Sequence, residues 1–435
     1  MRYCTRCLYP ENHPLGITFD DEGVCSGCRV HEEKDTLDWK PRREKLKKLL
    51  ERYRHRTGAN YDCVIPVSGA RDSYFIVHTV QKEFGLNPLV VHYNKHYNTR
   101  RGHRNLSYLR TIFDRDIYSM ILDPALLKRI TQRTLELRGS MYWHCLAGQT
   151  VLPVQVAVRY KIPLIIWGAH QGVDQVGMFS HEDEVEMSRR YRKDHDLMSL
   201  EAEDLVDEAG GLPERELRSF FYPHDKDIES AGVRGIYLNN FIRWDSKAQH
   251  EQMIETYEYE SASQQRTFDT YNDVDCIHYS GLHDLIKFYK WGYGKVTDHA
   301  CRELRLKRLS RDQALDMVRT YQDTAPTDIG AFLKWMDMSE KTLMEFVDRH
   351  RDPRVWQQDE KRGMWQLIGS ALDADKPANG DQVALNVTAP CAFQITPSKD
   401  PGANEEEYML QHRGYSDDHG VKGTSNPTPF SKASS

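Results

Sequence analysis

Four cysteines near the start of the chain have the spacing of a metal site. Cys4 and Cys7 form one Cys-x2-Cys pair, and Cys25 and Cys28 form a second pair after seventeen intervening residues. Each pair can turn two thiolates toward one ion, so the spacing indicates a tetrahedral zinc site. The segment between the pairs is too short for a core of its own, and zinc would supply its folding energy. With four protein ligands such a zinc would be structural. A redox pair and an iron–sulfur cluster are the alternatives.

A second motif is the turn Ser68–Ser73, which follows the apolar run Cys63–Val67 and precedes a helical pattern. A helix N-terminus directs unsatisfied N–H groups and the positive end of its dipole outward, and small residues let the backbone close around phosphate oxygens. The hydroxyls of Ser68 and Ser73 could donate to phosphate, and Asp72 could hold Mg²⁺. An ordinary strand–turn–helix junction is the alternative, since these are common turn residues.

The turn lacks the lysine and the spacing of a Walker A motif. Its residues, SGARDS, resemble the SGGxDS loop of the ATP pyrophosphatases, the PP-loop, which binds ATP through its leaving pyrophosphate and transfers AMP. The resemblance assigns Ser68, Gly69, Arg71, Asp72 and Ser73 to ATP binding, with Asp72 and Ser73 as catalytic candidates. Ala70 stands where the family has a second glycine, and it would be strained only if its φ were positive.

The elements that would position this turn alternate between strand and helix. Strands are predicted at 62–67, 89–92, 116–122 and 164–167, and helices at 73–83, 103–113, 124–138 and 146–160. Short apolar strands separated by helices predict right-handed βαβ units and a parallel sheet, so the fold class is α/β.

Ligands of such sheets bind beyond the carboxyl ends of the strands. The turn at 68–73, the segment 92–98 and the turn at 167–170 all fall there. We therefore expect His92 and Asn94 to meet adenine and ribose, although they could equally cap turns, and Gly168 to let the nucleotide approach closely. His170 and Asp174 are substrate candidates.

Composition limits the function further. The formal charge of −6 and the pI of about 6.4 give no overall attraction for nucleic acid. Nine cysteines, without an apolar leader, argue against a disulfide framework, and the apolar runs are too short for a membrane span. We expect a cytoplasmic protein.

The chain divides by pattern into five parts. We predict a Cys₄ zinc-binding knuckle at 1–40, a linker helix at 41–58, a PP-loop ATP-binding α/β domain at 59–178, a mostly helical substrate or partner domain at 179–372, and an extended or disordered tail at 373–435. Within the helical domain, the stretch 180–211 is predicted to be helical, and within the tail the stretch 384–393 could pair as a strand.

A zinc knuckle directly before a PP-loop domain resembles both tRNA-thiolating enzymes and the WbpG-like N-acetyl sugar amidotransferases. The stretches FSHEDEVEMSRRYRKDHDLM, GVRGIYLNNFIRWDSKAQHE and HYSGLHDLIKFYKWGYGKVTDHACRELRLKRLSR look like the second family. That resemblance covers about residues 1–350. It implies that ATP, with Mg²⁺, adenylates the carbonyl oxygen of an N-acetyl sugar, nucleotide-linked or free, and that ammonia then displaces AMP to give an acetamidino sugar for bacterial surface polysaccharide.

Further expectations follow from the resemblance. Lys295, Asp298 and His299 lie in a family-like motif and are candidates to contact sugar or partner, although a helix start explains them equally well. Ammonia is expected from separate glutaminase and ammonia-channelling subunits resembling those of imidazole glycerol phosphate synthase.

Two other classes stay open. A tRNA-thiolating enzyme could use Cys145 as nucleophile, but the acidic second half argues against it. A non-catalytic scaffold is suggested by Ala70 and by dependence on partner subunits.

Overall fold

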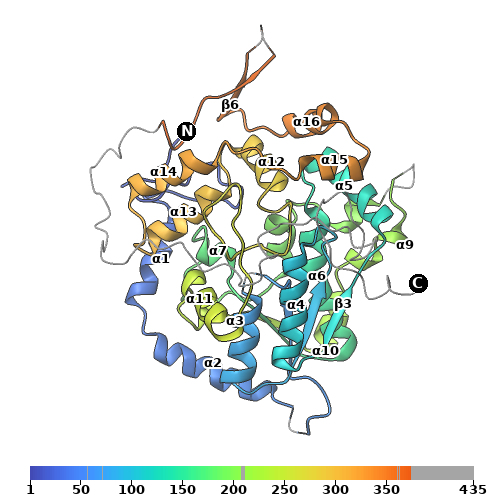
Figure 1. Ribbon diagram of the computed structural model, residues 1–435. Coiled ribbons are helices and arrows are strands. Elements are labelled where there is room, and N and C mark those ends of the chain that lie inside the picture. Colours follow the sequence, from blue (N-terminus) through green and yellow to red (C-terminus); the bar gives the residue numbers. More distant parts are fainter. Residues whose placement is uncertain (56, 71, 207–210, 360, 362, 374–435) are drawn as a thin grey trace, which may run out of the picture.

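A five-stranded parallel sheet forms the centre of the protein (Figure 1). The structure is a computed structural model and describes residues 1–55, 57–70, 72–206, 211–359, 361 and 363–373. The strand order is β3-β2-β1-β4-β5, so the order reverses between β1 and β4. The strands are β1 Cys63–Val67, β2 Pro88–Tyr93, β3 Ile117–Met120, β4 Leu164–Trp167 and β5 Arg234–Tyr237. The predicted parallel α/β sheet is thereby confirmed.

Two hydrophobic cores cover the two faces of the sheet. Cys63, Ile65 and Val67 of β1 face one core, which holds apolar residues of α2 (Trp39–Tyr53), α3 (Ser73–Val77), α4 (Arg100–Phe113) and α11 (Ser246–Tyr257). The alternate residue Val64 faces the other core, which α5 (Pro124–Arg138) and α6 (Trp143–Tyr160) supply. This alternation follows from the period of two along a strand and leaves both faces buried. The π-helical turn His78–Glu83 continues α3, so the helix predicted at 73–83 is present.

Strand β5 corrects the predicted boundary at residue 178. It lies inside the segment 179–372 that was predicted as a mostly helical domain, yet it pairs in parallel with β4 along its whole length. Its four residues, RGIY, offer too little apolar signal to be recognised as a strand. The central sheet therefore depends on both predicted domains.

The stretch 180–211 also differs from the prediction. Instead of a helix, its described residues form short turns, namely α8 (Arg189–Tyr191), a π-helical turn (Arg192–Asp196) and a 3₁₀ turn (Ala202–Leu205). A stretch that is polar on most faces has no apolar stripe to bury, so charge alone does not hold a long helix. The connection to β5 continues through α9 (Glu214–Leu217), the 3₁₀ turn Arg218–Phe220 and α10 (Asp225–Ala231), and β5 leads into the 3₁₀ turn Leu238–Asn240.

The C-terminal helices are α12 Leu282–Trp291, α13 Lys295–Arg305, α14 Arg311–Tyr321, α15 Ile329–Met336 and α16 Glu340–Asp348, followed by an antiparallel hairpin of β6 Trp356–Gln358 and β7 Trp365–Leu367. Of these, α13 and α14 pack against the N-terminal segment, whereas α15 and α16 lie beside α5 (Figure 1). The N-terminal segment contributes α1 (Ser26–Thr36), and α7 (Gln171–Asp174) follows β4. The helical patterns after residue 282 are thus present. The predicted tail, apart from Asp373, lies outside the described residues, as does the candidate strand 384–393. Within the described part of the chain, no helix combines the length and apolarity that a bilayer span requires.

Candidate active site and metal site

The turn after β1 closes tightly where the strand order reverses. Gly69 has φ +84, and a Cβ there would lie 2.6 Å from the Gly102 carbonyl oxygen of α4. Glycine is therefore required both by the backbone angle and by the approach of α4. Ser73 then begins α3, as the sequence predicts. Arg71 lies outside the described residues.

Ala70 does not strain this turn. It is fully buried, and it does not belong to the residues with positive φ. Alanine is as acceptable as glycine at such a backbone angle. The departure from the PP-loop pattern therefore has no backbone cost.

The two serine hydroxyls brace the turn. The Ser73 hydroxyl donates to the Ala70 carbonyl over 2.7 Å and accepts from the Ser68 N–H over 3.1 Å. The Ala70 N–H donates to the Ser68 hydroxyl over 3.2 Å. In this structure these groups hold the turn closed, so a phosphate would have to replace some of these bonds.

A cavity of about 180 Å³ lies at the carboxyl ends of β1, β2 and β4. Ser68, Asp72, Ser73 and Gly168 line it together, as the sequence analysis expects. Four further side chains, for which the sequence carries no motif, also line the cavity, namely Tyr93, Lys95, Gln149 and Gln171. Along the chain, Tyr93 and Lys95 alternate with His92 and Asn94, the two residues that the sequence predicts as nucleotide contacts.

His92 and Asn94 shape the turn after β2 and do not line this cavity. The His92 Nδ1 lies 3.2 Å from the Val67 carbonyl oxygen, and burial lowers the pKa of His92 to about 4, so the ring is neutral. The Asn94 side-chain oxygen accepts from the His96 N–H and the Asn98 amide over 2.9 and 2.8 Å. Both residues hold the segment that carries Tyr93 and Lys95.

A larger cavity of about 410 Å³ adjoins the first. The two share Asp72, Leu146, Gln171 and Tyr279 as lining residues. Four substrate candidates from the sequence line the larger cavity, which are Asp174, Lys295, Asp298 and His299. The structure thus joins the turn after β1 to a chamber built largely by the C-terminal helices.

Each of these four side chains has an ion-pair or hydrogen-bond partner within the protein. Asp174 pairs with Lys34, and Asp298 pairs with Lys287 and accepts from the Tyr9 hydroxyl over 3.1 Å. The Lys295 ammonium lies 3.0 Å from Asp273. The His299 Nδ1 lies 2.6 Å from the Thr267 hydroxyl, and burial lowers the pKa of His299 to about 4.

His170 lies in an aromatic cluster outside both cavities. Its side chain is 1% exposed, and its ring lies 4.2 Å from that of Tyr191 and 4.6 Å from that of Tyr237 on β5. Burial lowers the pKa of His170 to about 4. The residue packs the end of β4 against β5, where substrate does not reach it in this structure.

Two further residues of the larger cavity titrate near neutral pH. Burial raises the pKa of Asp196 to about 7, although nearby Arg192 opposes the shift. Burial lowers the pKa of Lys290 to about 8, and its ammonium donates to the Arg138 carbonyl over 2.6 Å. Shifts of this kind gather in functional clefts. Both residues lie in stretches that resemble the WbpG-like family, but no local pattern singles out either side chain.

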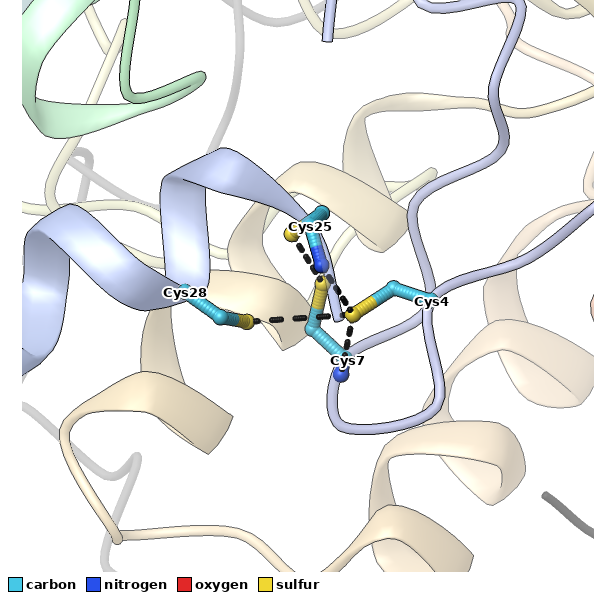
Figure 2. Close-up of side chains that lie close together, drawn as sticks. All are labelled: Cys4, Cys7, Cys25 and Cys28. Atoms are coloured by element: carbon cyan, nitrogen blue, oxygen red, sulfur yellow. Dashed lines mark hydrogen bonds between the residues drawn. The ribbon is translucent and has the colours of Figure 1, made fainter. Parts of the chain in front are cut away.

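The four N-terminal cysteines meet at one point (Figure 2). All four are buried, and their sulfurs lie within 4.8 Å of one another. The Cys4–Cys28 and Cys7–Cys25 sulfur distances are 3.9 and 3.5 Å. Tetrahedral zinc with Zn–S bonds of about 2.3 Å places its sulfurs about 3.8 Å apart, so the donor set fits zinc. An iron–sulfur cluster would hold the thiolates farther apart, because sulfide and iron atoms stand between them.

Backbone and side-chain donors surround these sulfurs. The N–H groups of Arg6, Cys7 and Cys25 each donate to the Cys4 sulfur over 3.2–3.4 Å. The Arg305 guanidinium of α13 lies 3.5 Å from the Cys25 sulfur and 4.0 Å from the Cys7 sulfur. Burial would lower the pKa of Arg305, but the thiols of Cys28, Cys25 and Cys7 outweigh burial and raise it. These donors would stabilise the negative charge of a four-thiolate zinc centre.

Comparisons with known proteins extend over different parts of the chain. Residues 265–371 match the family model "LPS biosynthesis protein WbpG-like, C-terminal domain". A 105-residue stretch is 26% identical to the uncharacterized protein MJ1599 of Methanocaldococcus jannaschii, covering 23% of this chain and 36% of that protein. The chain thus matches about a third of the length of this curated relative.

Two solved structures match about half of the chain at low similarity. NMN synthetase from Francisella tularensis has a TM-score of 0.26 at 15% identity, over 45% of this chain and 93% of that one. NH3-dependent NAD synthetase from Campylobacter jejuni has a TM-score of 0.27 at 13% identity, over 51% and 86%. The match to the WbpG-like C-terminal domain thus lies in the helical segment that walls the larger cavity.

Proposed function

We propose that this protein is an ATP-dependent amidotransferase that adenylates the carbonyl oxygen of an N-acetylated sugar and lets ammonia displace AMP. One observation carries the proposal, namely that two cavities share Asp72. The smaller lies at the turn after β1, and the larger is walled by the WbpG-like domain. A reaction that joins a nucleotide to a second substrate needs two such chambers that meet at the reacting atoms.

We assign the smaller cavity to the phosphates of ATP. Its volume of about 180 Å³ is below the usual range of about 300–1,000 Å³ for a complete ligand site, so it suits one end of a nucleotide. Parallel α/β sheets bind nucleotides where the strand order reverses, which here is between β1 and β4. Ser68 and Ser73 are placed to exchange their hydrogen bonds within the turn for bonds to phosphate.

We assign the larger cavity to the sugar. Its volume of about 410 Å³ lies within the range for small-molecule sites, and its lining mixes aromatic rings with carboxylates and ammonium groups. The Lys295 ammonium lies 3.2 Å from the centre of the Tyr279 ring. Tyr279, which both cavities share, is thereby held at the boundary where the acetamido group would meet the α-phosphate.

The chain's residues position the reactants, and a metal ion would neutralise charge. Asp72 would hold Mg²⁺, which supplies electrostatic stabilisation of the leaving pyrophosphate when it is bound. Lys95, whose ammonium pairs with Asp275, and the amide of Gln149 line the smaller cavity. These groups favour the charge that develops as AMP is transferred to the amide oxygen.

The ammonia source is expected on separate subunits. A glutaminase nucleophile needs a thiol with a lowered pKa. Burial instead raises the pKa values of Cys63, Cys145 and Cys276. These thiols are therefore poor nucleophiles, which supports partner subunits that make and channel ammonia. The same burial makes Cys145 unsuited to tRNA thiolation.

The proposal is tested by measuring AMP and pyrophosphate with candidate N-acetyl sugars, ATP, Mg²⁺ and ammonium. We expect AMP formation that requires sugar and is lost in Asp72→Ala, while the zinc content and the thermal unfolding midpoint stay as in the wild type. Adenylation that requires tRNA instead of sugar would overturn the proposal. Efficient use of glutamine by the chain alone would overturn the part about partner subunits.

A further inference from the structure

Asp196 presents a carboxylate to the larger cavity without a partner that neutralises it. It ends the π-helical turn Arg192–Asp196, and it lines the cavity together with Asp72 and Asp174. Within the described part of the chain, the Asp196 carboxylate has no hydrogen bond and no ion pair within 4 Å. The other cavity acids considered above differ, since Asp174 pairs with Lys34 and Asp298 pairs with Lys287.

Two anchors hold the segment that carries Asp196 near the junction of the cavities. Arg192 donates to the Thr150 hydroxyl of α6 over 2.9 Å and to the Ala147 carbonyl over 3.4 Å. Arg138, at the end of α5, donates to the Met198 carbonyl over 3.0 Å. Leu146, next to Ala147 on α6, lines both cavities. Asp196 is thus fixed in the wall of the larger cavity, on a segment anchored to α6 beside Leu146.

The groups around Asp196 do not neutralise the negative charge of its carboxylate. Arg192 is the nearby cation, but its guanidinium lies 2.6 Å from a Glu201 carboxylate oxygen. The phenols of Tyr191 and Tyr237 stay neutral, because burial raises the pKa of both. His195 on the same turn has its pKa lowered by burial.

Asp72, Asp174 and the Lys290 ammonium line the same cavity. Burial raises the pKa of Asp196 to about 7, which suits a base that acts near neutral pH.

We propose that Asp196 is the general base that takes a proton from ammonium at the junction of the two cavities. The inference rests on the proposed function and adds a residue to it. An ammonium ion is attracted to an uncompensated carboxylate, and it cannot attack carbon until it loses a proton. Asp196 would both attract the cation and convert it into the nucleophile.

In the proposed reaction, the Asp196 carboxylate forms an O–H bond with one proton of ammonium, and the N–H electron pair becomes the lone pair of ammonia. That lone pair forms the C–N bond to the adenylated carbon, and the C–O bond to AMP breaks with its electrons on the departing oxygen. The nitrogen gives a second proton to the departing AMP, which leaves an amidinium sugar. Asp196 returns its proton to water.

Hydroxylamine distinguishes this role from a structural one, because it is uncharged at pH 7.5 and needs no deprotonation before it attacks. With ammonium, we expect Asp196→Asn to form AMP at least tenfold more slowly than the wild type. With hydroxylamine, we expect rates within twofold of each other, which also shows that the variant is folded and adenylates its substrate. Asp194→Asn is the matched control, since Asp194 lies on the same turn and pairs with the exposed Arg190.

The outcomes separate the two proposals. An equal loss with both nucleophiles, or no loss with ammonium, would overturn the role of Asp196 and leave the proposed function standing. A wild-type chain that forms no AMP with any N-acetyl sugar would overturn the proposed function and the role of Asp196 together. A deficit with ammonium that shrinks as pH rises, and as uncharged ammonia becomes abundant, would support the proposal.

Discussion

The Arg305 guanidinium lies 3.5 Å from the sulfur of Cys25. Arg305 belongs to α13 of the WbpG-like domain, and its other guanidinium nitrogen donates to the Gln175 carbonyl over 2.6 Å. One buried side chain therefore joins the four-cysteine knuckle, the C-terminal helices and the segment after β4. Arg305 and Gln175 also line the larger cavity. The side chain that donates to the metal-site sulfurs thus also lines the proposed sugar chamber.

Arg305→Gln should weaken zinc binding. A four-thiolate zinc centre carries a net negative charge, and loss of a nearby donor typically costs about 10–100-fold in metal affinity. Competition with a chromogenic chelator measures the change. Arg319→Gln, on the exposed side of α14, should bind zinc like the wild type. Unchanged zinc affinity in Arg305→Gln would show that the guanidinium does not stabilise the thiolates.

Cys28→Ser should lose the metal. We expect about one zinc per wild-type chain and less than about a tenth of that in the variant, because serine is a poor zinc ligand at neutral pH. Cys301→Ser is the control, since Cys301 accepts a hydrogen bond from the Leu8 N–H and lies outside the four-cysteine set. Elemental analysis by mass spectrometry gives both values. Zinc retained in Cys28→Ser, or lost equally in Cys301→Ser, would contradict the assignment.

Local patterns made the central features predictable. The paired cysteines and the turn Ser68–Ser73 are contiguous in sequence, and their chemistry depends on near neighbours. The strands β1, β2 and β4 carry long apolar runs because both faces of the sheet are buried, so their positions followed from composition. The helices after residue 282 have apolar residues at helical spacing, and that signal is also local.

The features that could not be predicted from the sequence depend on contacts between segments that are distant in the chain. Strand β5 is short and was not recognised, so the packing of Tyr237 against His170 could not be foreseen, and His170 was placed at the substrate. Tyr93 and Lys95 differ from His92 and Asn94 only in the direction of their side chains, which pairing in the sheet decides. Asp196 and Lys290 acquire unusual pKa values through burial by distant segments.

Substitution at Gly69 should cost more stability than substitution at Ala70. Gly69→Ala places a Cβ 2.6 Å from the Gly102 carbonyl at a positive φ, which costs at least about 1–2 kcal/mol of stability and opens the turn. Ala70→Gly should cost no more than about 1 kcal/mol, through added freedom of the unfolded chain. Urea unfolding and ATP binding by calorimetry measure both effects. Stronger ATP binding by Ala70→Gly would show that alanine does hinder the turn.

Lys95 and Asp275 should show strong coupling. Their charged groups lie 2.6 Å apart and are buried, joining the end of β2 to the WbpG-like domain. Removing one partner of a buried pair costs about 3–5 kcal/mol, because the other charge stays buried. We expect Lys95→Met to be less stable than the double variant Lys95→Met with Asp275→Asn. A double-mutant cycle of urea unfolding measures the coupling, and additive effects would contradict it.

The stability of the protein should depend on Asp196 in a pH range that its pKa defines. The folded pKa is raised to about 7 from the usual 3.8, so the folded state holds a proton that the unfolded state releases. Stability should therefore fall as pH rises from about 4 to about 7, and the full penalty applies above that range.

Asp196→Asn removes this penalty. Although a pKa raised to about 7 corresponds to about 4 kcal/mol, screening by water in the cavity should leave about 1–2 kcal/mol. The variant should exceed the wild type by that amount in free energy of unfolding at pH 8, and the difference should vanish near pH 3, below the unfolded pKa. Urea unfolding at the two pH values, with Asp194→Asn as control, measures it. A difference independent of pH would mean that the substitution acts through packing, because only an ionising carboxylate makes the gain disappear on acidification.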